Sequence, residues 1–400
     1  MSTADSEGRL KRAEWLMQPD TQRVMALLDG AQGRTRAVGG IVRDTLLDLP
    51  RNATDIDLAT ELLPDEVVAR AGRAGLAAYP TGIAHGTVTL KLGALVTEVT
   101  TLRQDVETDG RHAVVKFGTS WKNDAARRDF TMNALYAGMD GTLFDPLSGI
   151  DDLLARKVRF IGKPAQRIDE DRLRVYRFFR FSASHGNERI DQDGYAACKA
   201  AAGMLDRLAA ERVGAEMRLM LALPKVANTL AAMVRAGVLA LPGEAVKLLQ
   251  VYERNARRPN LTGRLAILMA VMSADLLQDI WRLSNDDIRT TAAVVTVARL
   301  LGDFHVNEAA YRHPAALSDG VEVAAVLSDW GEAGKAALRD QLERLDVPRF
   351  PLKGGDLVAA GFRPGPALGA ELERLERLWI EGGFTLDREA LLDLTRPNDD

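Results

Sequence analysis

Two patterns of hydrophobic and polar residues divide this chain. From Arg34 to about Pro146, short segments with the alternating apolar and polar pattern of β-strands are interspersed with segments of helical periodicity. This pattern predicts strands over 35–40, 55–60, 87–93 and 95–102, with a helix over 41–49 between the first two. We therefore expect an α+β domain in this part of the chain.

The remainder of the chain has helical patterns. After Gly149 strand signals nearly vanish, and apolar residues recur at helical spacing, as in segments 209–223 and 336–347. Proline and glycine separate such segments at Pro242-Gly243, Pro348 and Pro364-Gly365. The pattern predicts an all-α part. Because 400 residues exceed what one hydrophobic core usually supports, we expect two or more domains.

Composition narrows the class of protein. Apolar residues make up 46% of the chain and charged residues 27%, and no apolar run approaches the ~18 residues of a membrane span. The chain opens with a polar stretch that lacks the pattern of a secretory signal, and its single cysteine, Cys198, excludes an internal disulfide. We therefore expect a cytoplasmic protein with no membrane contact, in which Cys198 is a small buried side chain.

Charge is distributed unevenly along the sequence. The formal net charge of −4 argues against a protein that coats nucleic acid without selectivity. Segment 156–180, however, has nine Lys or Arg residues against three acidic ones, a local charge of +6. This surplus predicts that an anionic ligand binds there.

The segment Val38–Asp44 (VGGIVRD) is a candidate for phosphate binding, since a predicted strand passes into a helix there. Gly39 and Gly40 have no Cβ, so phosphate oxygens could approach their backbone N–H groups, and Arg43 could add a charge-assisted hydrogen bond. The alternative is a plain glycine turn.

A pair of carboxylates follows eleven residues later. Asp55 and Asp57 lie two residues apart on a predicted strand, so both side chains point to the same face. Divalent ions such as Mg²⁺ would neutralise them, and two ions could activate a 3′-hydroxyl and stabilise a leaving pyrophosphate. If the strand that carries Glu98 is parallel to this one, Glu98 is a third carboxylate at the same end of the sheet. The alternatives are solvated acids at a strand end and a solvent-facing Glu98.

Segment 127–135 (RRDFTMNAL) has helical spacing and supplies two further candidates. Arg128 and Asn133 could contact a triphosphate and its sugar, whereas Phe130 and Leu135 fit a hydrophobic core. The Asp145-Pro146 that follows, with Gly149, predicts a tight turn with a structural role.

Segment 170–180 (EDRLRVYRFFR) is the most informative. As one helix it would place Asp171, Arg174, Arg177 and Arg180 on a single ridge. A carboxylate only accepts hydrogen bonds and a guanidinium only donates them, so Asp171 and Arg174 match a base with an amino group beside a ring acceptor. Cytosine and adenine have that edge, whereas uracil and guanine have the reverse, so one protein edge could select CTP and ATP without a template. The alternative is a surface ion pair between the two side chains.

In this order the motifs resemble those of the class II tRNA nucleotidyltransferases, a family that also contains bacterial poly(A) polymerases. The resemblance extends over roughly residues 35–215, through GGxxRD from Gly39, DxD at Asp55, RRDFTxNAL from Arg127, DPxxG from Asp145 and EDxxRxxR from Glu170. It implies a small-sheet palm followed by a helical neck, body and tail. On this basis we expect the head domain at 1–149, the neck at 150–220, and a tRNA-binding body and tail at 221–400.

The resemblance also implies a role for each motif. Asp55 and Asp57 would bind Mg²⁺, and Asp171 and Arg174 would read the base. The nucleotide would be held by residues of several motifs: Gly40, Arg43, Arg128, Arg177 and Arg180. A later motif, formed by Glu211-Arg212 and Glu216, would brace the neck helix. The partners would be CTP, ATP, and the 3′ end and elbow of tRNA.

Two segments favour the CCA-adding branch of the family. Tyr79–Val88 (YPTGIAHGTV) resembles that branch, and 103–122, with Thr108–His112 at its centre, resembles the flexible loop that CCA-adding members retain. A poly(A) polymerase and an enzyme that adds only CC remain alternatives. A third is a catalytically inactive RNA-binding module on the same fold, against which the intact acidic pair argues.

Overall fold

The computed structural model describes residues 3–50, 54–108 and 113–396. The chain forms two compact units, one of Met1–Glu216 with Asn228–Ala240 and one of Met217–Ala227 with Leu241–Asp400. The first unit contains both sheets. Within the described ranges, the second unit is built from helices alone.

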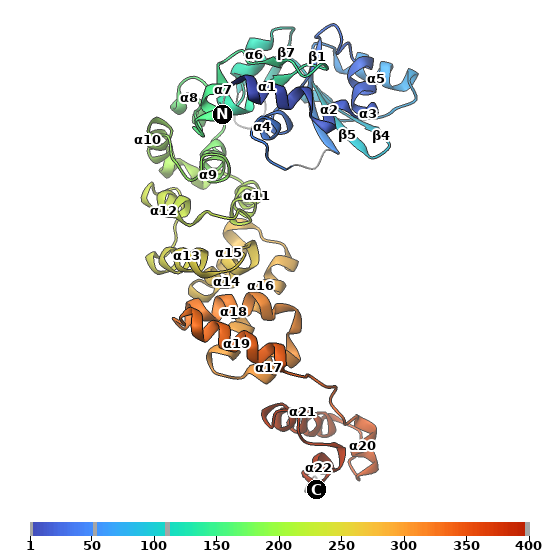
Figure 1. Ribbon diagram of the computed structural model, residues 1–400, viewed down its shortest axis with the longest axis vertical. Coiled ribbons are helices and arrows are strands. Elements are labelled where there is room, and N and C mark those ends of the chain that lie inside the picture. The colour runs from blue at the N-terminus through green and yellow to red at the C-terminus, as the bar shows by residue number, and fades with distance from the viewer. Residues whose placement is uncertain (1–2, 51–53, 109–112, 397–400) are drawn as a thin grey trace. The chain divides into compact units, whose positions relative to one another are not determined.

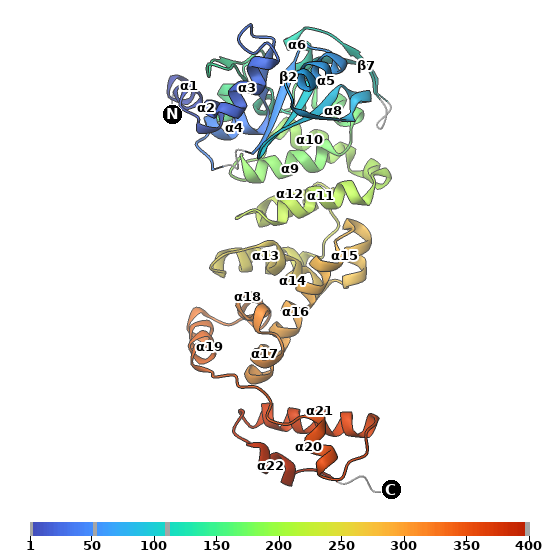
Figure 2. The same ribbon diagram turned by 90° about the vertical axis from the view of Figure 1, so that its right-hand side faces the viewer.

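A seven-stranded mixed sheet forms the centre of the first unit (Figure 2). Its strands lie in the order β3 (Ala77–Gly82), β4 (Thr87–Leu92), β5 (Leu95–Thr101), β2 (Asp55–Thr60), β1 (Thr35–Val38), β8 (Tyr136–Ala137) and β9 (Leu143–Phe144). β2 and β5 run parallel, and the other neighbouring pairs are antiparallel. This confirms the parallel arrangement on which the placement of Glu98 depends.

Side-chain alternation gives the central strands one buried and one open face. In β2, Ile56 and Leu58 are buried whereas Asp55 and Asp57 are exposed. Helix α5 (Pro64–Arg73) packs against β3, β4 and β5, and α4 (Gly40–Leu46) packs against β1 and β2 (Figure 1). The predicted strands and the helix after β1 are confirmed, whereas β3, β8 and β9 were not predicted.

A separate two-stranded hairpin, β6 (Arg103–Thr108) and β7 (Ala113–Phe117), follows β5. At its base, the Arg103 guanidinium donates a hydrogen bond to the carbonyl of His85. Gly86 has φ 81°, and a Cβ there would lie 2.6 Å from the Phe117 ring, so the ring requires a glycine at this turn. Residues 109–112, at the centre of the expected flexible loop, lie outside the described residues.

Most of the helices after β7 belong to the first unit. Their bounds are α6 (Trp121–Ala126), α7 (Gly149–Leu154), α8 (Pro164–Glu170), α9 (Arg174–Ser184), α10 (Gln192–Ala201), α11 (Ala210–Leu221) and α12 (Ala227–Arg235), with a 3₁₀ turn η2 (Thr131–Asn133). α11 is divided between the two units after Glu216, and α12 belongs to the first unit from Asn228 onward. At the N-terminal end of the unit lie α1 (Thr3–Lys11), α2 (Glu14–Met17) and α3 (Pro19–Leu27). Trp15 of α2 donates a hydrogen bond to Thr45 of α4, which ties these helices to the one that follows β1.

Two helical predictions are wrong. Segment 170–180 is not one helix, because α8 ends at Glu170 and Asp171 has extended backbone angles, φ −151° and ψ 105°. Segment 127–135 is helical only in the short turn η2, and Phe130 forms a β-bridge with Phe160 instead. Phe130 and Leu135 are nevertheless fully buried, as predicted.

The turn at Asp145 has the structural role that the sequence predicts. The Asp145 carboxylate accepts hydrogen bonds from the backbone N–H groups of Gly149 and Ile150, at 2.8 and 2.9 Å. A Cβ at Gly149 would lie 2.2 Å from the carbonyl oxygen of Thr131, so only glycine fits against η2 there. Cys198 is also fully buried, as expected.

The second unit consists of helices over its described residues, as the sequence predicts. They are α13 (Gly243–Asn255), α14 (Leu261–Val271), α15 (Ala274–Trp281), α16 (Asn285–Gly302), α17 (Val306–Arg312), α18 (Leu317–Leu327), α19 (Glu332–Arg344), α20 (Gly354–Ala359), α21 (Pro366–Glu381) and α22 (Arg388–Asp393). Trp379 and Leu391 belong to a hydrophobic cluster that joins the last three helices. Among the described residues, no helix is long and apolar enough to cross a membrane.

Candidate active site

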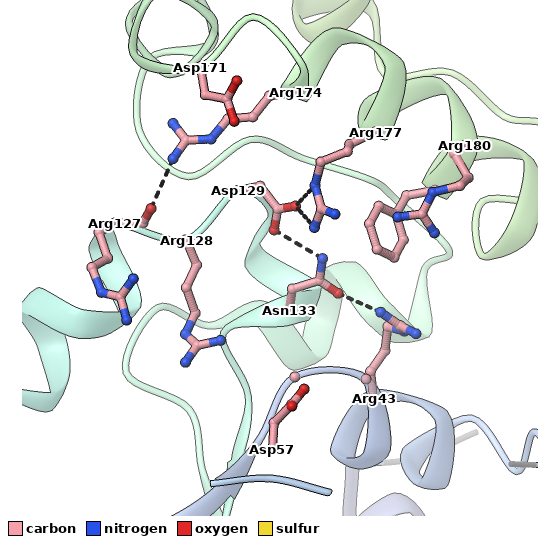
Figure 3. A pocket seen from close by; sticks show the side chains of 13 residues that line it. Arg43, Asp57, Arg127, Arg128, Asp129, Asn133, Asp171, Arg174, Arg177 and Arg180 are labelled. Atoms are coloured by element: carbon pink, nitrogen blue, oxygen red, sulfur yellow. Dashed lines mark hydrogen bonds and ion pairs between the residues drawn. The ribbon is translucent and has the colours of Figure 1, made fainter. Parts of the chain in front are cut away.

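One pocket of about 490 Å³ in the first unit brings most of the predicted site residues together (Figure 3). Its walls come from the end of β1, from β2, from the segment around η2, and from α9. The lining residues are Gly39, Gly40, Arg43, Asp57, Arg127, Arg128, Asp129, Asn133, Asp171, Arg174, Arg177, Arg180 and Phe181. Asp55 and Glu98 lie outside this list, on the open face of the sheet.

The acidic side of the pocket is formed where β1 ends beside β2. Gly39 has φ 75°, a conformation that favours glycine, and a Cβ there would lie 3.7 Å from a carboxylate oxygen of Asp57. The absent side chain leaves this carboxylate open toward the pocket. Asp55, two residues earlier on β2, is exposed on the same face.

Glu98 lies beside this pair. In the parallel pairing of β2 with β5, Glu98 is directly opposite Asp57, and it is also exposed. The described residues contain no group of three His, Cys, Asp or Glu side chains close enough to hold a metal ion by themselves. An Asp pair fits a divalent ion that takes one or two carboxylates and completes its shell with water and phosphate oxygens.

A chain of charged hydrogen bonds crosses the back of the pocket (Figure 3). Arg43 donates to the side-chain oxygen of Asn133 at 2.7 Å, and the Asn133 amide donates to Asp129 at 3.0 Å. Arg177 then donates to the second oxygen of Asp129 through Nε and one terminal nitrogen, at 2.9 and 2.5 Å. The chain fixes groups from α4, η2 and α9 relative to one another.

The carboxylates in this chain are ionised. Burial favours the neutral acid at Asp129, but the charge of Arg177 and the hydrogen bond from Asn133 lower its pKa below the usual value. Asp44, which accepts a hydrogen bond from Arg43, is partly buried, yet its bond to His185 and the charge of Arg43 hold its pKa far below the usual range. The basic groups of the pocket are therefore partly balanced by fixed negative charge.

Three arginines surround one aromatic ring on the remaining wall. The guanidinium carbons of Arg180, Arg43 and Arg177 lie 4.4, 5.1 and 5.4 Å from the centre of the Phe181 ring. Glu216 of α11 accepts hydrogen bonds from Arg180 at 2.5 Å and from Arg177 at 3.5 Å. This contact confirms that Glu216 braces α9, as the resemblance implies.

The two expected base-reading residues line the pocket but do not form the ion pair that was the alternative interpretation. Asp171 pairs with Arg212 of α11 at 2.9 Å, and its other oxygen accepts from the Leu173 backbone N–H. Arg174 pairs with Glu170 at 2.6 Å. Each side chain is therefore held in place by its own hydrogen-bonding partners, and both face the same pocket (Figure 3).

Three lining residues were not among the sequence-based candidates: Arg127, Asp129 and Phe181. Asp129 follows Arg128 directly, and an acidic residue next to two arginines in the sequence is a candidate for an ion pair. Phe181 carries no such signal, because its apolar character fits the core equally well. Arg127 contributes its backbone carbonyl, which accepts a hydrogen bond from Arg174 at 3.2 Å.

Comparison with known proteins identifies this arrangement. Residues 35–159 match the family described as the poly A polymerase head domain. The fold is that of a nucleotidyltransferase. The chain is 32% identical over 376 residues to the mitochondrial CCA tRNA nucleotidyltransferase 1 of Danio rerio, a match that covers 90% of this chain and 86% of that protein.

Further relatives give the same assignment. The chain is 33% identical to the CCA-adding enzyme of Limosilactobacillus fermentum, over 92% of this chain and 94% of that one. The crystal structure of the Bacillus stearothermophilus CCA-adding enzyme in complex with CTP has a TM-score of 0.74 and 28% identity, with 92% of this chain and 94% of that chain covered. The protein belongs to the CCA-adding enzyme family, whose members use divalent metal ions.

Proposed function

We propose that this protein adds C, C and A to the 3′ end of tRNA from CTP and ATP, with Mg²⁺ bound at Asp55 and Asp57. The observation that carries the proposal is the pocket itself, in which Asp57, a set of arginines and the Asp171 and Arg174 pair converge. The related Bacillus stearothermophilus enzyme was solved with CTP, one of the two nucleotides required. A poly(A) polymerase would have no use for CTP.

The arrangement assigns a task to each wall of the pocket. Arg43, Arg128, Arg177 and Arg180 would hold the triphosphate, and Asn133 would orient Arg43 and contact the sugar. Gly39 and Gly40 line the pocket and have no Cβ, which would let the nucleotide approach the backbone. Two Mg²⁺ ions at Asp55 and Asp57, with Glu98 adjacent, would supply activation of the RNA 3′-hydroxyl and charge stabilisation of the leaving pyrophosphate. Ordered arginines require little rearrangement as charge develops on the phosphates.

Base selection would depend on hydrogen-bond donors of Arg174 and acceptors of Asp171 that are not used in bonds within the protein. Arg174 has five N–H groups, and three of them bond to Glu170 and to the backbone carbonyls of Arg167 and Arg127. The others remain available for the ring nitrogen of cytosine or adenine. Asp171 likewise retains acceptor capacity for the amino group beyond its bonds to Arg212 and Leu173.

Incubation with tRNA that lacks CCA, with each nucleoside triphosphate in turn and with CTP and ATP together, tests the proposal. Resolved product lengths should show addition of CC with CTP alone and of CCA with the mixture. A product that stops at CC in the mixture would indicate a CC-adding enzyme, and a long run of A would indicate a poly(A) polymerase. We place the reaction in the cytoplasm and assign tRNA elbow binding to residues 221–400.

Arg212 should influence base selection through Asp171. We expect Arg212→Ala to raise UTP and GTP incorporation relative to CTP by a few-fold, because a partly exposed ion pair contributes up to about 1 kcal/mol. Competition assays with mixed nucleotides measure the ratio. Arg218→Ala is a matched control, since Arg218 lies on the same helix and forms an exposed ion pair with Asp287. Equal ratios for the two variants would contradict a role for Arg212.

A further inference from the structure

The open face of the sheet continues from the acidic pair to the outermost strand. The strand register places Asp57, Glu98, Thr89 and Tyr79 directly opposite one another on β2, β5, β4 and β3. Directly opposed residues point to the same face of a sheet. Asp57, Glu98 and Tyr79 are all exposed, and the Tyr79 side chain is 49% exposed although it is a large aromatic group.

The next row of the same face contains a cation. Asp55 is opposite Val96, Val96 is opposite Lys91, and Lys91 is opposite Ala77. Lys91 is exposed on β4, two residues along from Thr89, the residue opposite Tyr79. An exposed ring and an exposed ammonium group therefore lie close together at the edge of the sheet that is remote from the nucleotide pocket.

The position of the pocket determines which side the RNA must occupy. The pocket is built on the β1 side of β2, from Gly39, Asn133 and α9. In phosphoryl transfer the attacking hydroxyl and the leaving pyrophosphate lie on opposite sides of the phosphorus. With the nucleotide on the β1 side of Asp57, the RNA 3′ end must therefore approach over β5, β4 and β3.

We propose that this face binds the last unpaired nucleotides of the RNA, with Tyr79 stacked on a base and Lys91 in contact with a phosphate. The inference rests on the proposed function, since it takes the RNA 3′ end to react at Asp57. Three strand spacings of about 4.8 Å place Tyr79 about 14 Å from Asp57, so the stacked base precedes the reacting nucleotide. Stacking tolerates any base, which suits a substrate whose 3′ end changes with each addition.

The edge strand β3 is poorly suited to pairing with a strand of another chain, which leaves its side chains accessible to a different ligand. β3 contains Pro80, which lacks a backbone N–H, and the register of β3 with β4 shifts between Tyr79 and Gly82. Proline and register irregularities prevent a neighbouring chain from extending a sheet. The Tyr79 ring is thus exposed at an edge that is protected from strand pairing.

Kinetics with tRNA that ends in CC measure the effect during addition of the terminal A. Tyr79→Ala should raise the KM for tRNA about tenfold, within the range measured for loss of one stacked base, and leave kcat and the KM for ATP unchanged. Tyr79→Phe should retain the wild-type KM because the ring remains. Leu63→Ala is the control, since Leu63 is 52% exposed and lies just before α5. A tRNA KM for Tyr79→Ala equal to that of the control would overturn the proposal.

A binding experiment gives a readout that does not depend on catalysis. We would place 2-aminopurine at nucleotide 73 of tRNA ending in CC and titrate the full chain without nucleotides or divalent ions. Wild type and Tyr79→Phe should quench the fluorescence, whereas Tyr79→Ala should bind with little quenching. Equal quenching by Tyr79→Ala and wild type would reject stacking on Tyr79 even if CCA addition is normal. Quenching without any nucleotide addition would instead retain the binding site and reject the proposed function.

Discussion

Replacing Asp57 with alanine is expected to reduce the rate of nucleotide addition by about a thousandfold or more. Asp57 is the acidic side chain that the pocket and the open sheet face share, so it lies where the RNA 3′ end and the nucleotide would meet. A catalytic metal contributes several kcal/mol of transition-state stabilisation, and each 1.4 kcal/mol corresponds to about tenfold in rate. Single-turnover addition of C to tRNA lacking CCA measures this loss.

Two further variants make the test specific. Asp55→Ala should have a comparable effect, whereas Asp65→Asn, an exposed acid in the first turn of α5, should react at the wild-type rate. Binding of tRNA to the Asp57 variant, measured by filter retention, should persist because tRNA elbow binding is assigned to residues 221–400. If either acidic variant retains more than about a tenth of the activity, the two-metal assignment is wrong.

The acidic part of the site could be predicted because it depends on short-range geometry. The period of two along a strand puts Asp55 and Asp57 on one face whatever surrounds them. Placing Glu98 beside them required one further assumption, the parallel pairing of two strands, which is confirmed. The hydrophobic pattern also predicted the main strands and the change to helices after Gly149.

The basic part of the site was harder to predict because tertiary contacts determine it. Segment 170–180 has helical periodicity throughout, yet the backbone is extended at Asp171, whose carboxylate bonds to the Leu173 N–H and to Arg212, 41 residues further on. Such a distant partner leaves no local signal. Phe181 shows the same limit, because its apolar character predicts only burial, whereas its contact with Arg43 depends on the distant helix α4.

Loss of the Asp171 carboxylate is the change expected to alter specificity most. Asp171→Ala removes the acceptor for the amino group of C or A from a pocket wall, and an unpaired amino group costs about 1–3 kcal/mol, or roughly 5- to 150-fold in kcat/KM for CTP and ATP. UTP and GTP, whose carbonyl groups the carboxylate repels, should lose less or gain. With UTP incorporation unchanged, the ratio of CTP to UTP incorporation should therefore fall by about 5- to 150-fold.

A matched variant separates base reading from general damage to this region. Asp169→Ala removes an exposed acid two residues away on α8, and it should leave both the rate and the CTP to UTP ratio unchanged. Arg174→Ala should relax discrimination as Asp171→Ala does, since it removes the donor opposite the ring nitrogen. If Asp171→Ala slows CTP and ATP equally and still rejects UTP and GTP at the wild-type ratio, Asp171 only anchors α11 through Arg212. The base edge would then be read by another wall of the pocket.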